Sequence, residues 1–309
     1  MKFLVTGSAG FLGSHLCEAL LKMGHKVIGL DNYQTGSRLN YETFVSNSSF
    51  ISYEQDVRIP FSMEVDGIFN LACPASPIQY QKNPVQTLTT NIQGAINCLE
   101  LATKLEIPIL QASTSEVYGD PQITPQSEQY WGNVNPIGIR SCYDEGKRAT
   151  ETLFFDYYRQ FGTQIKVARI FNTYGPRMSS NDGRVVSNFV VQALRNEDIT
   201  IYGDGNQTRS LCYVDDLIKG LISLFFVQQE NPTPVNLGNP TPISMNNLAH
   251  EIVLLTQSAS KIIHLPLPED DPVNRQPDIA IASALLGFFP KIDRDEGLLR
   301  TIFYFKSIL

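Results

Sequence analysis

Residues 1–31 read MKFLVTGSAGFLGSHLCEALLKMGHKVIGLD, and this stretch decides the fold class. Lys2–Thr6 is a short apolar run that predicts a strand. Residues 11–23 carry apolar side chains at helical spacing and stop before Gly24, so they predict a helix. Residues 26–30 predict a second strand, which Asp31 closes. A strand, a helix and a strand in this order predict a parallel strand pair with a crossover helix.

A glycine-rich turn joins the first predicted strand to the helix, with Gly7, Gly10 and Gly13 spaced three residues apart. Glycines let the backbone turn sharply and approach a pyrophosphate, whose charge the helix N-terminus favours. Asp31 follows the second strand, where a carboxylate accepts hydrogen bonds from an adenosine ribose and repels a 2′-phosphate. The turn therefore predicts NAD rather than NADP, although Arg38 nearby weakens that preference. The alternative is a plain turn followed by a solvated aspartate.

Strand-like and helix-like segments alternate to about residue 175, which predicts a Rossmann-type, doubly wound parallel sheet. Beyond that point Gly and Pro become frequent, and longer loops separate the predicted helices. We therefore expect an α/β protein with an NAD-binding domain over residues 1–175 and a smaller, interleaved substrate-binding lobe over residues 176–309. The remaining predicted strands are 50–53, 68–72, 109–112 and 166–170, and the remaining predicted helices are Pro84–Leu105, Ser141–Phe161, 184–195, Val214–Phe226, 244–256 and 296–305.

Composition excludes several classes of function. The formal charge of −7, with acids and bases interspersed, argues against a nucleic-acid-binding surface. No run of about 18 apolar residues occurs, and the first residues lack the pattern of a signal peptide. The five cysteines form no CxxC pair, and the four histidines lack the spacing of metal ligands. We therefore expect reduced thiols, a cytoplasmic location, no membrane contact and no metal.

Tyr143 and Lys147 are four residues apart on a predicted helix, so both side chains lie on one face. A lysine ammonium close to a tyrosine stabilises the phenolate, which predicts a lowered pKa for Tyr143 and a role as base. The spacing alone is common on amphipathic helices. It gains weight because it follows a dinucleotide motif and the polar segment 113–116 at the end of a predicted strand, where parallel sheets bind ligands.

Longer motifs make the chain similar to a known family. They are TGSAGFLG at 6–13, STSEVYGDP at 113–121, YDEGK at 143–147, ARIFNTYGPR at 168–177, NDGRVVSNF at 181–189 and GDGNQTRSLCYVDDL at 203–217. The sequence resembles the extended short-chain dehydrogenase/reductase family, and within it the enzymes that decarboxylate UDP-glucuronate. The resemblance runs from residue 1 to about residue 280.

The resemblance implies roles for residues at matching positions. Tyr143 would take the proton of the sugar 4-hydroxyl, Lys147 would hold the nicotinamide ribose, and Thr114 would hydrogen-bond the same hydroxyl. The residues implied in NAD binding also include Gly7, Gly10, Phe11, Leu12, Gly13, Asp31, Asn32, Tyr33, Thr35, Gly36, Asp56, Val57 and Leu71. Those implied on the nucleotide-sugar side are Asn172, Arg184, Tyr202, Arg209 and Arg275. A homodimer through a four-helix bundle, which includes the Tyr143 helix, is also implied.

Ser115 and Glu116 distinguish the reactions of such relatives. A 4,6-dehydratase needs an acid near the leaving 6-hydroxyl, and serine is a poor one. A 4-epimerase needs no glutamate at this point. Oxidation of a glucuronate at carbon 4 gives a β-keto acid that loses carbon dioxide readily, with Arg209 as a partner for the carboxylate and Glu116, with a water or Ser115, assisting reprotonation of carbon 5. We therefore expect conversion of UDP-glucuronate into UDP-xylose; dehydratase and epimerase activity, and an NAD-sensing regulator, are the alternatives.

Overall fold

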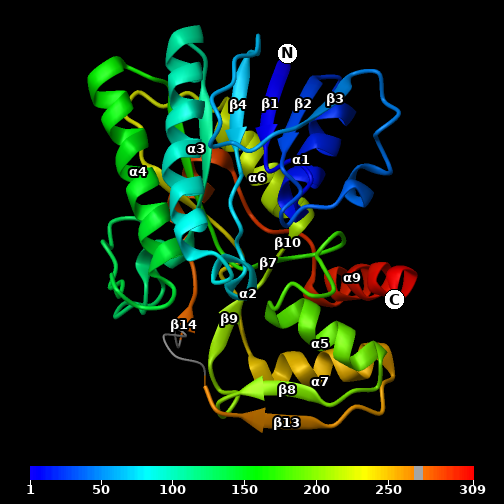
Figure 1. Cartoon of the computed structure of the whole chain (residues 1–309). Helices are drawn as coiled ribbons and strands as arrows, with labels where there is room; N and C mark the ends of the chain where they lie inside the picture. The colour runs from blue at the N-terminus through cyan, green and yellow to red at the C-terminus, as the bar shows by residue number, and fades with distance from the viewer. Residues whose placement is uncertain (268–273) are drawn as a thin grey trace.

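A seven-stranded parallel sheet forms the centre of the protein, with helices on both faces (Figure 1). The structure is a computed structural model and describes residues 1–267 and 274–309. The strand order is β11-β6-β5-β4-β1-β2-β3, so the direction of strand addition reverses between β1 and β4. The predicted Rossmann-type fold is confirmed. The strands are β1 Lys2–Thr6, β2 Lys26–Asp31, β3 Phe50–Glu54, β4 Gly67–Asn70, β5 Ile109–Thr114, β6 Ile165–Ile170 and β11 Pro234–Leu237.

Two layers of helices bury the two faces of this sheet. On β1, Phe3 and Val5 belong to one apolar cluster and Leu4 to another, because successive side chains point to opposite faces. All three side chains are fully buried, so each stabilises the fold by roughly 2 kcal/mol. The first face is covered by α1 Phe11–Lys22 and α6 Val214–Phe226, and the second by α3 Pro84–Leu105 and α4 Ser141–Phe161.

The seventh strand comes from the second half of the chain. β11 pairs with β6 in parallel, although it lies within residues 176–309. The segment is only four residues long and begins with Pro234, so its own pattern predicts no strand, and pairing with β6 creates it. Residues 176–309 therefore do not all lie apart from the central sheet, because α6 packs on it and β11 joins it. The division into two domains at about residue 175 stays a prediction.

A smaller lobe lies at the carboxyl ends of the central strands (Figure 1). It is built on α5 and α7, which pack against each other, and on the parallel pair β8 and β13. The elements of the lobe and of the connecting segments are η1 Arg38–Tyr41, α2 Pro77–Tyr80, η2 Ser115–Tyr118, β7 Thr173–Tyr174, α5 Val185–Leu194, β8 Ile199–Tyr202, β9 Thr208–Ser210, β10 Cys212–Tyr213, β12 Pro242–Ser244, α7 Met245–Thr256, β13 Ile262–Leu265, β14 Asn274–Arg275, α8 Ala280–Leu286 and α9 Arg294–Ile308.

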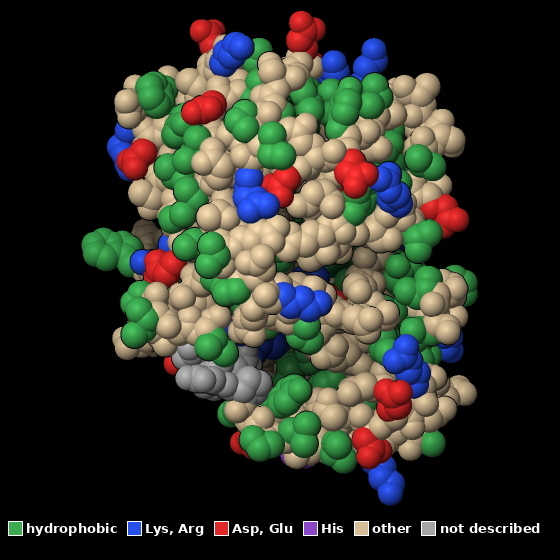
Figure 2. Space-filling model, viewed as in Figure 1, with side chains coloured by type: hydrophobic (Ala, Val, Ile, Leu, Met, Phe, Trp, Pro, Cys, Tyr) green, Lys and Arg blue, Asp and Glu red, His purple; other side chains and the backbone are tan. Residues whose placement is uncertain are grey.

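The distribution of charged side chains on the surface agrees with the mixed charges of the sequence. Acidic and basic side chains are mixed over the face drawn in Figure 2, which is hollowed between the large domain and the small lobe. Within residues 1–267 and 274–309, no helix combines the length and apolar character needed to span a membrane. The same residues contain no cluster of three or more His, Cys, Asp or Glu side chains arranged to hold a metal ion. All five cysteines are free thiols.

Candidate active site

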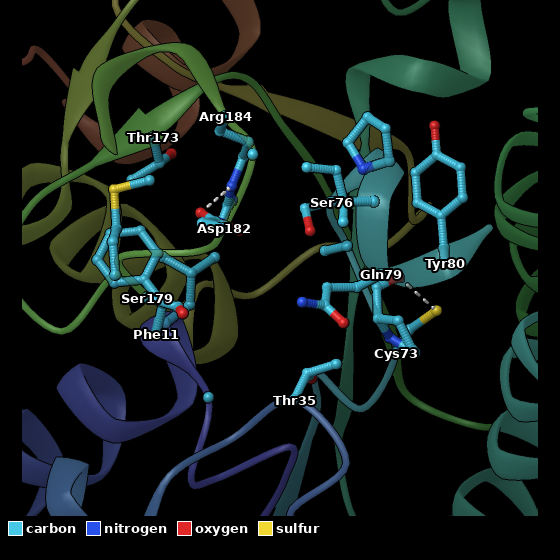
Figure 3. Close-up of a pocket in the computed structure, with 18 of the residues that line it drawn as sticks. Phe11, Thr35, Cys73, Ser76, Gln79, Tyr80, Thr173, Ser179, Asp182 and Arg184 are labelled. Carbon is cyan, nitrogen blue, oxygen red and sulfur yellow. Dashed lines mark hydrogen bonds and ion pairs between the residues drawn. The ribbon is translucent and has the colours of Figure 1, made fainter. Parts of the chain in front are cut away.

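A cleft of about 1250 Å³ lies between the carboxyl ends of the central strands and the small lobe. Its lining includes the glycine-rich turn after β1, together with residues of η2, α4 and the small lobe. This is the edge of a parallel sheet at which ligands bind, beside the point where the strand order reverses. Figure 3 shows Ser76, Gln79 and Tyr80 on one wall, facing Asp182 and Arg184 on the other.

The glycine-rich turn leaves no room for side chains. Gly7 has φ +68°, a conformation that favours glycine. A Cβ on Gly13 would lie 2.1 Å from the carbonyl oxygen of Gly7, so the first turn of α1 packs directly on the turn before it. Gly10 is the N-cap of α1 and no side chain caps this helix end. The free N–H groups of α1 therefore face the cleft, as a pyrophosphate site requires.

Asp31 shapes this turn from the end of β2. Its Oδ2 accepts a hydrogen bond from the backbone N–H of Ala9 at 2.9 Å, and its Oδ1 accepts one from Tyr33 at 2.8 Å. Burial raises the pKa of the carboxyl, against these two hydrogen bonds. Asp31 also lines the cleft. The carboxylate thus fixes the two loops between which an adenosine ribose would lie.

Most of the residues expected around the cofactor line the cleft. They are Gly7, Gly10, Phe11, Leu12, Gly13, Asp31, Asn32, Thr35, Gly36, Val57, Leu71, Tyr143 and Lys147. Tyr33 and Asp56 do not belong to this lining. The ring of Tyr33 lies under the Arg38 guanidinium, 4.1 Å from centroid to carbon, and Asp56 forms an ion pair with Arg58 at 2.7 Å. Contact of these two side chains with NAD stays a prediction.

Tyr143 and Lys147 lie together on the buried face of α4 and both line the cleft. The Tyr143 ring stacks on Tyr80 with centroids 5.0 Å apart and planes 5° apart. The Thr114 side chain lies close enough to the Tyr143 hydroxyl to lower the pKa of the phenol, against the effect of burial. The Lys147 ammonium donates to the carbonyl oxygen of Ala112 at 2.9 Å and lies 5.7 Å from the Tyr143 ring centroid. The expected constellation of Tyr143, Lys147 and Thr114 is therefore assembled.

The expected direction of the Tyr143 pKa is wrong as far as the chain's own groups determine it. Burial raises the pKa of Tyr143 well above its usual value, and Cys73 and Glu116 add to the rise. Burial also lowers the pKa of Lys147, whose ammonium is directed to Ala112. Spacing on the helix could not reveal this, because desolvation depends on the elements that close over α4. Tyr143 is therefore a neutral phenol until further positive charge enters the cleft.

Glu116 is held by two arginines, one from each part of the molecule. Arg140 Nη2 donates to its Oε2 at 2.7 Å, and the Arg275 guanidinium donates to both carboxylate oxygens. Burial alone would raise the pKa of Glu116, but the charges of Arg275 and Arg140 hold it below its usual value. Glu116 is therefore an ion, so it cannot itself supply the proton to carbon 5; a water or the Ser115 hydroxyl must do so. Ser115 is buried and lines the cleft.

Asp144 is a fourth charged side chain in this cluster, and sequence reasoning missed it. Its Oδ2 lies 3.9 Å from Nε of Arg140. Burial and the nearby Glu116 raise the pKa of Asp144 from 3.8 to about 7. Arg140 and Tyr80 were missed as well. The sequence does contain one indication that Arg140 belongs to the site, because it lies only three residues before Tyr143.

The raised pKa predicts that Asp144→Asn stabilises the fold at neutral pH. The unfolded chain loses the Asp144 proton near pH 4, whereas the folded chain keeps it to about pH 7. Wild type therefore loses stability over this interval, and the amide does not. We expect the free energy of unfolding of the variant to exceed that of wild type by a margin that grows from pH 4 to pH 7, to at most about 4 kcal/mol. Denaturant unfolding across this range measures it; a margin that shrinks with pH would contradict it.

The other expected substrate residues also line the cleft: Asn172, Arg184, Tyr202, Arg209 and Arg275. Arg184 is held by Asp182, with Nε and Oδ2 2.6 Å apart (Figure 3). Arg209 lies on β9 directly opposite Arg275 on β14. Arg275 differs from the expectation, because its guanidinium contacts Glu116. The small lobe thus brings two adjacent arginines to the Tyr143 end of the cleft.

Comparison with known proteins gives one consistent result. The family model of the NAD dependent epimerase/dehydratase family matches residues 3–238, which ends just after β11. UDP-glucuronic acid decarboxylase 6 of Arabidopsis thaliana is 52% identical over 96% of this chain and 87% of its own length. UDP-glucuronic acid decarboxylase 1 of Xenopus tropicalis is 50% identical over 100% of this chain and 73% of its own length.

Solved structures show the same fold. A UDP-glucuronic acid 4-epimerase from Bacillus cereus, in complex with UDP-glucuronic acid and NAD, has a TM-score of 0.89 at 28% identity and covers 100% of both chains. A UDP-glucose 4-epimerase from Thermotoga maritima, with UDP-glucose, has a TM-score of 0.90 at 28% identity and covers 100% of this chain and 99% of its own.

Proposed function

This chain belongs to the NAD dependent epimerase/dehydratase family, and from that premise we propose that it decarboxylates UDP-glucuronate to UDP-xylose with NAD as its cofactor. One observation carries the choice of substrate. Arg209 and Arg275 lie opposite each other on β9 and β14, and both line the cleft together with Tyr143. Guanidinium groups are charge-assisted hydrogen-bond donors that match the planar geometry of a carboxylate, so this pair suits a sugar that bears one. A neutral hexose, the substrate of a 4,6-dehydratase, offers no such partner.

The cleft fits NAD. Side chains at Gly7 and Gly13 would clash with the backbone of Leu71 and of Gly7, so glycine at both positions lets the turn and the start of α1 pack closely. The uncapped start of α1 supplies N–H donors for a pyrophosphate. Asp31 and its neighbours would hold the adenosine ribose, and Lys147 the nicotinamide ribose. When bound, NAD accepts a hydride from carbon 4 of the sugar, later returns it, and brings a positive charge into the cleft.

Oxidation of carbon 4 depends on Tyr143. A positive charge in the cleft lowers the pKa of its phenol toward the working range, against the effect of burial. Tyr143 then takes the proton of the sugar 4-hydroxyl while the hydride leaves carbon 4. Thr114, whose side chain lies near Tyr143, orients the same hydroxyl. The product is a 4-ketone with a carboxylate on carbon 5.

The ketone then accepts the electrons of the bond to the carboxylate, and carbon dioxide leaves. The protonated Tyr143 stabilises the resulting enolate oxygen by a hydrogen bond. Carbon 5 takes a proton from a water or from the Ser115 hydroxyl, which the ionised Glu116 orients and polarises. As carbon 4 is reduced again, Tyr143 would give its proton to the carbonyl oxygen, which yields UDP-xylose and leaves Tyr143 ready for the next cycle. No step needs an acid that could expel the 6-hydroxyl of a hexose.

The substrate assignment is tested by product analysis with two nucleotide sugars. We expect UDP-glucuronate to be converted into UDP-xylose and carbon dioxide, and dTDP-glucose to remain unchanged, as proton NMR of each mixture will show. A 4-keto-6-deoxy sugar from dTDP-glucose, with UDP-glucuronate untouched, would overturn the proposal in favour of a dehydratase. UDP-galacturonate as the product would indicate a 4-epimerase, the activity named for the B. cereus structure.

Arg209→Met should weaken the binding of UDP-glucuronate specifically. A charge-assisted partner of the substrate carboxylate is lost, so we expect KM to rise by about 30-fold to 100-fold. Arg209→Lys should recover part of the loss, because it restores the charge without the planar fork. UDP-glucose, which lacks the carboxylate, is the matched control ligand, and its inhibition constant should not change. An equal loss for both ligands would show that Arg209 binds the nucleotide instead.

We also infer a homodimer formed by α3 and α4. The two helices pack side by side over one face of the sheet (Figure 1). Half-buried apolar side chains on them, Leu88, Ile92 and Ile96 on α3 and Tyr157 on α4, support pairing with a second copy. Light scattering after size-exclusion chromatography tests the mass. A cytoplasmic location stays a prediction.

A further inference from the structure

Arg140 has no role in the reaction described so far, yet it occupies the centre of the charged cluster. It lies just before α4, three residues from Tyr143, and its side chain is buried. Its Nη2 donates to Oε2 of Glu116 at 2.7 Å. We propose that Arg140 is a positioning residue, which fixes the Glu116 carboxylate beside the reacting sugar independently of Arg275. The inference rests on the proposed decarboxylation.

The two arginines that hold Glu116 are attached in different ways. The carbonyl oxygen of Arg140 accepts hydrogen bonds from the N–H groups of Tyr143 at 3.0 Å and Asp144 at 3.1 Å. The residue is thus tied to the first turn of α4, in the domain that carries Tyr143. Arg275 comes from β14, a two-residue strand of the small lobe, and lies opposite Arg209. Any shift of the small lobe moves Arg275 relative to Glu116, and leaves Arg140 in place.

The substrate provides a reason for such a shift. A sugar carboxylate that enters beside Arg209 is a second anion within reach of the adjacent Arg275. Arg275 then divides its hydrogen bonds between two carboxylates. A buried carboxylate that loses its only cationic partner takes up a proton or moves. Because Arg140 remains, Glu116 keeps its charge and its position at the moment when carbon 5 needs a polarised proton donor.

The surroundings of Glu116 make this second arginine necessary. Tyr80 on α2 and Tyr143 and Asp144 on α4 face the cluster, together with Arg275 from the small lobe. Asp144 is itself an acid, and the two tyrosines bring no positive charge. Among these groups only the arginines stabilise the ionised form of Glu116.

The experiment compares Arg140→Met with Arg140→Lys in the full-length, NAD-loaded enzyme. Arg159→Met is the matched control, because Arg159 is an exposed arginine in the last turn of α4, paired with Asp156. Misplacing a reacting group by about 1 Å costs about 100-fold in rate, so we expect Arg140→Met to lower kcat at pH 7 by about that factor with KM changed less than about threefold. The kcat of Arg140→Lys should be at least tenfold higher than that of Arg140→Met.

The pH profile separates positioning from a general loss of structure. In Arg140→Met we expect a new acid limb, in which kcat falls as pH decreases through the raised pKa of Glu116. A purely structural role would lower kcat equally at every pH and would lower Tm. Unchanged kcat with the wild-type pH profile in Arg140→Met would overturn the proposal, as would a uniform loss that Arg140→Lys fails to recover.

An infrared titration without substrate keeps this test separate from the proposed function. The band of a protonated carboxyl that disappears in Glu116→Gln reports Glu116. We expect this band to appear at higher pH in Arg140→Met than in wild type and Arg159→Met. Its appearance at the same pH in all three would show that Arg275 suffices, and would overturn the proposal even if the wild-type enzyme decarboxylates UDP-glucuronate. If the wild type made no UDP-xylose, the proposed function would fail, and the titration would still decide the role of Arg140.

Discussion

Tyr143→Phe is expected to lower kcat for UDP-glucuronate by about 10³-fold to 10⁴-fold, because the phenylalanine has no hydroxyl to take the proton of the sugar 4-hydroxyl. The ring that stacks on Tyr80 at 5.0 Å is kept, so the walls of the cleft should not change. KM should therefore stay within about threefold of wild type, since binding precedes proton transfer. Initial rates of carbon dioxide release measure both constants.

Tyr157→Phe is the matched control for this loss. Tyr157 lies on the same helix but outside the lining of the cleft, so its hydroxyl should be dispensable. Turnover by Tyr143→Phe at more than about a tenth of the wild-type rate would contradict the assignment, because removal of a general base costs at least about 10²-fold. A loss confined to KM would place Tyr143 in binding alone.

Gly13→Ala is expected to weaken NAD binding strongly. The new Cβ would lie 2.1 Å from the Gly7 carbonyl oxygen and 2.8 Å from the Ser8 Cα. Both atoms belong to the backbone, so the turn itself must open and carry its N–H groups away from the pyrophosphate. Overpacking of this kind costs about 2 to 3 kcal/mol, which corresponds to at least about a 30-fold rise in the Kd for NAD. Calorimetric titration with NAD measures it.

Gly287→Ala is the control for this variant. Gly287 is the C-cap of α8 with φ +61°, and the added Cβ would point into open space as far as residues 1–267 and 274–309 show. Left-handed strain should lower the free energy of unfolding by about 1 kcal/mol without any effect on NAD affinity. Wild-type NAD affinity in Gly13→Ala would show that the turn does not cradle the pyrophosphate.

The sequence predicts six of the seven central strands from their apolar runs. Five of them are largely buried, as expected for a parallel sheet that is covered on both faces, whereas β3 at the sheet edge buries only Phe50. β11 could not be predicted from the sequence. Its four residues begin with proline and are too few to show a strand pattern of alternating side chains, so pairing with β6 determines their conformation. The helices α3 and α4 are predicted with correct bounds, since Pro84 begins one and Gly162 ends the other.

The functional site, like the fold, could be predicted from the sequence only in part. The local motifs predict most of the residues that line the cleft. Each motif follows a predicted strand or lies on a predicted helix, and on a helix the residue spacing shows which side chains share one face. Partners across the fold could not be predicted. The ion pairs of Glu116 with Arg140 and Arg275 join residues far apart in the chain. The raised pKa of Tyr143 arises from burial that no sequence spacing encodes.

The central claim is that one enzyme oxidises carbon 4, releases the carboxyl group and returns the same hydrogen to carbon 4. Turnover of UDP-glucuronate in D₂O, followed by proton and deuterium NMR, tests it most directly. We predict UDP-xylose with one deuterium on carbon 5, the original hydrogen on carbon 4, and no net change in NAD. UDP-xylose with deuterium on carbon 4, or a uronic acid that retains its carboxyl group, would contradict this sequence of steps.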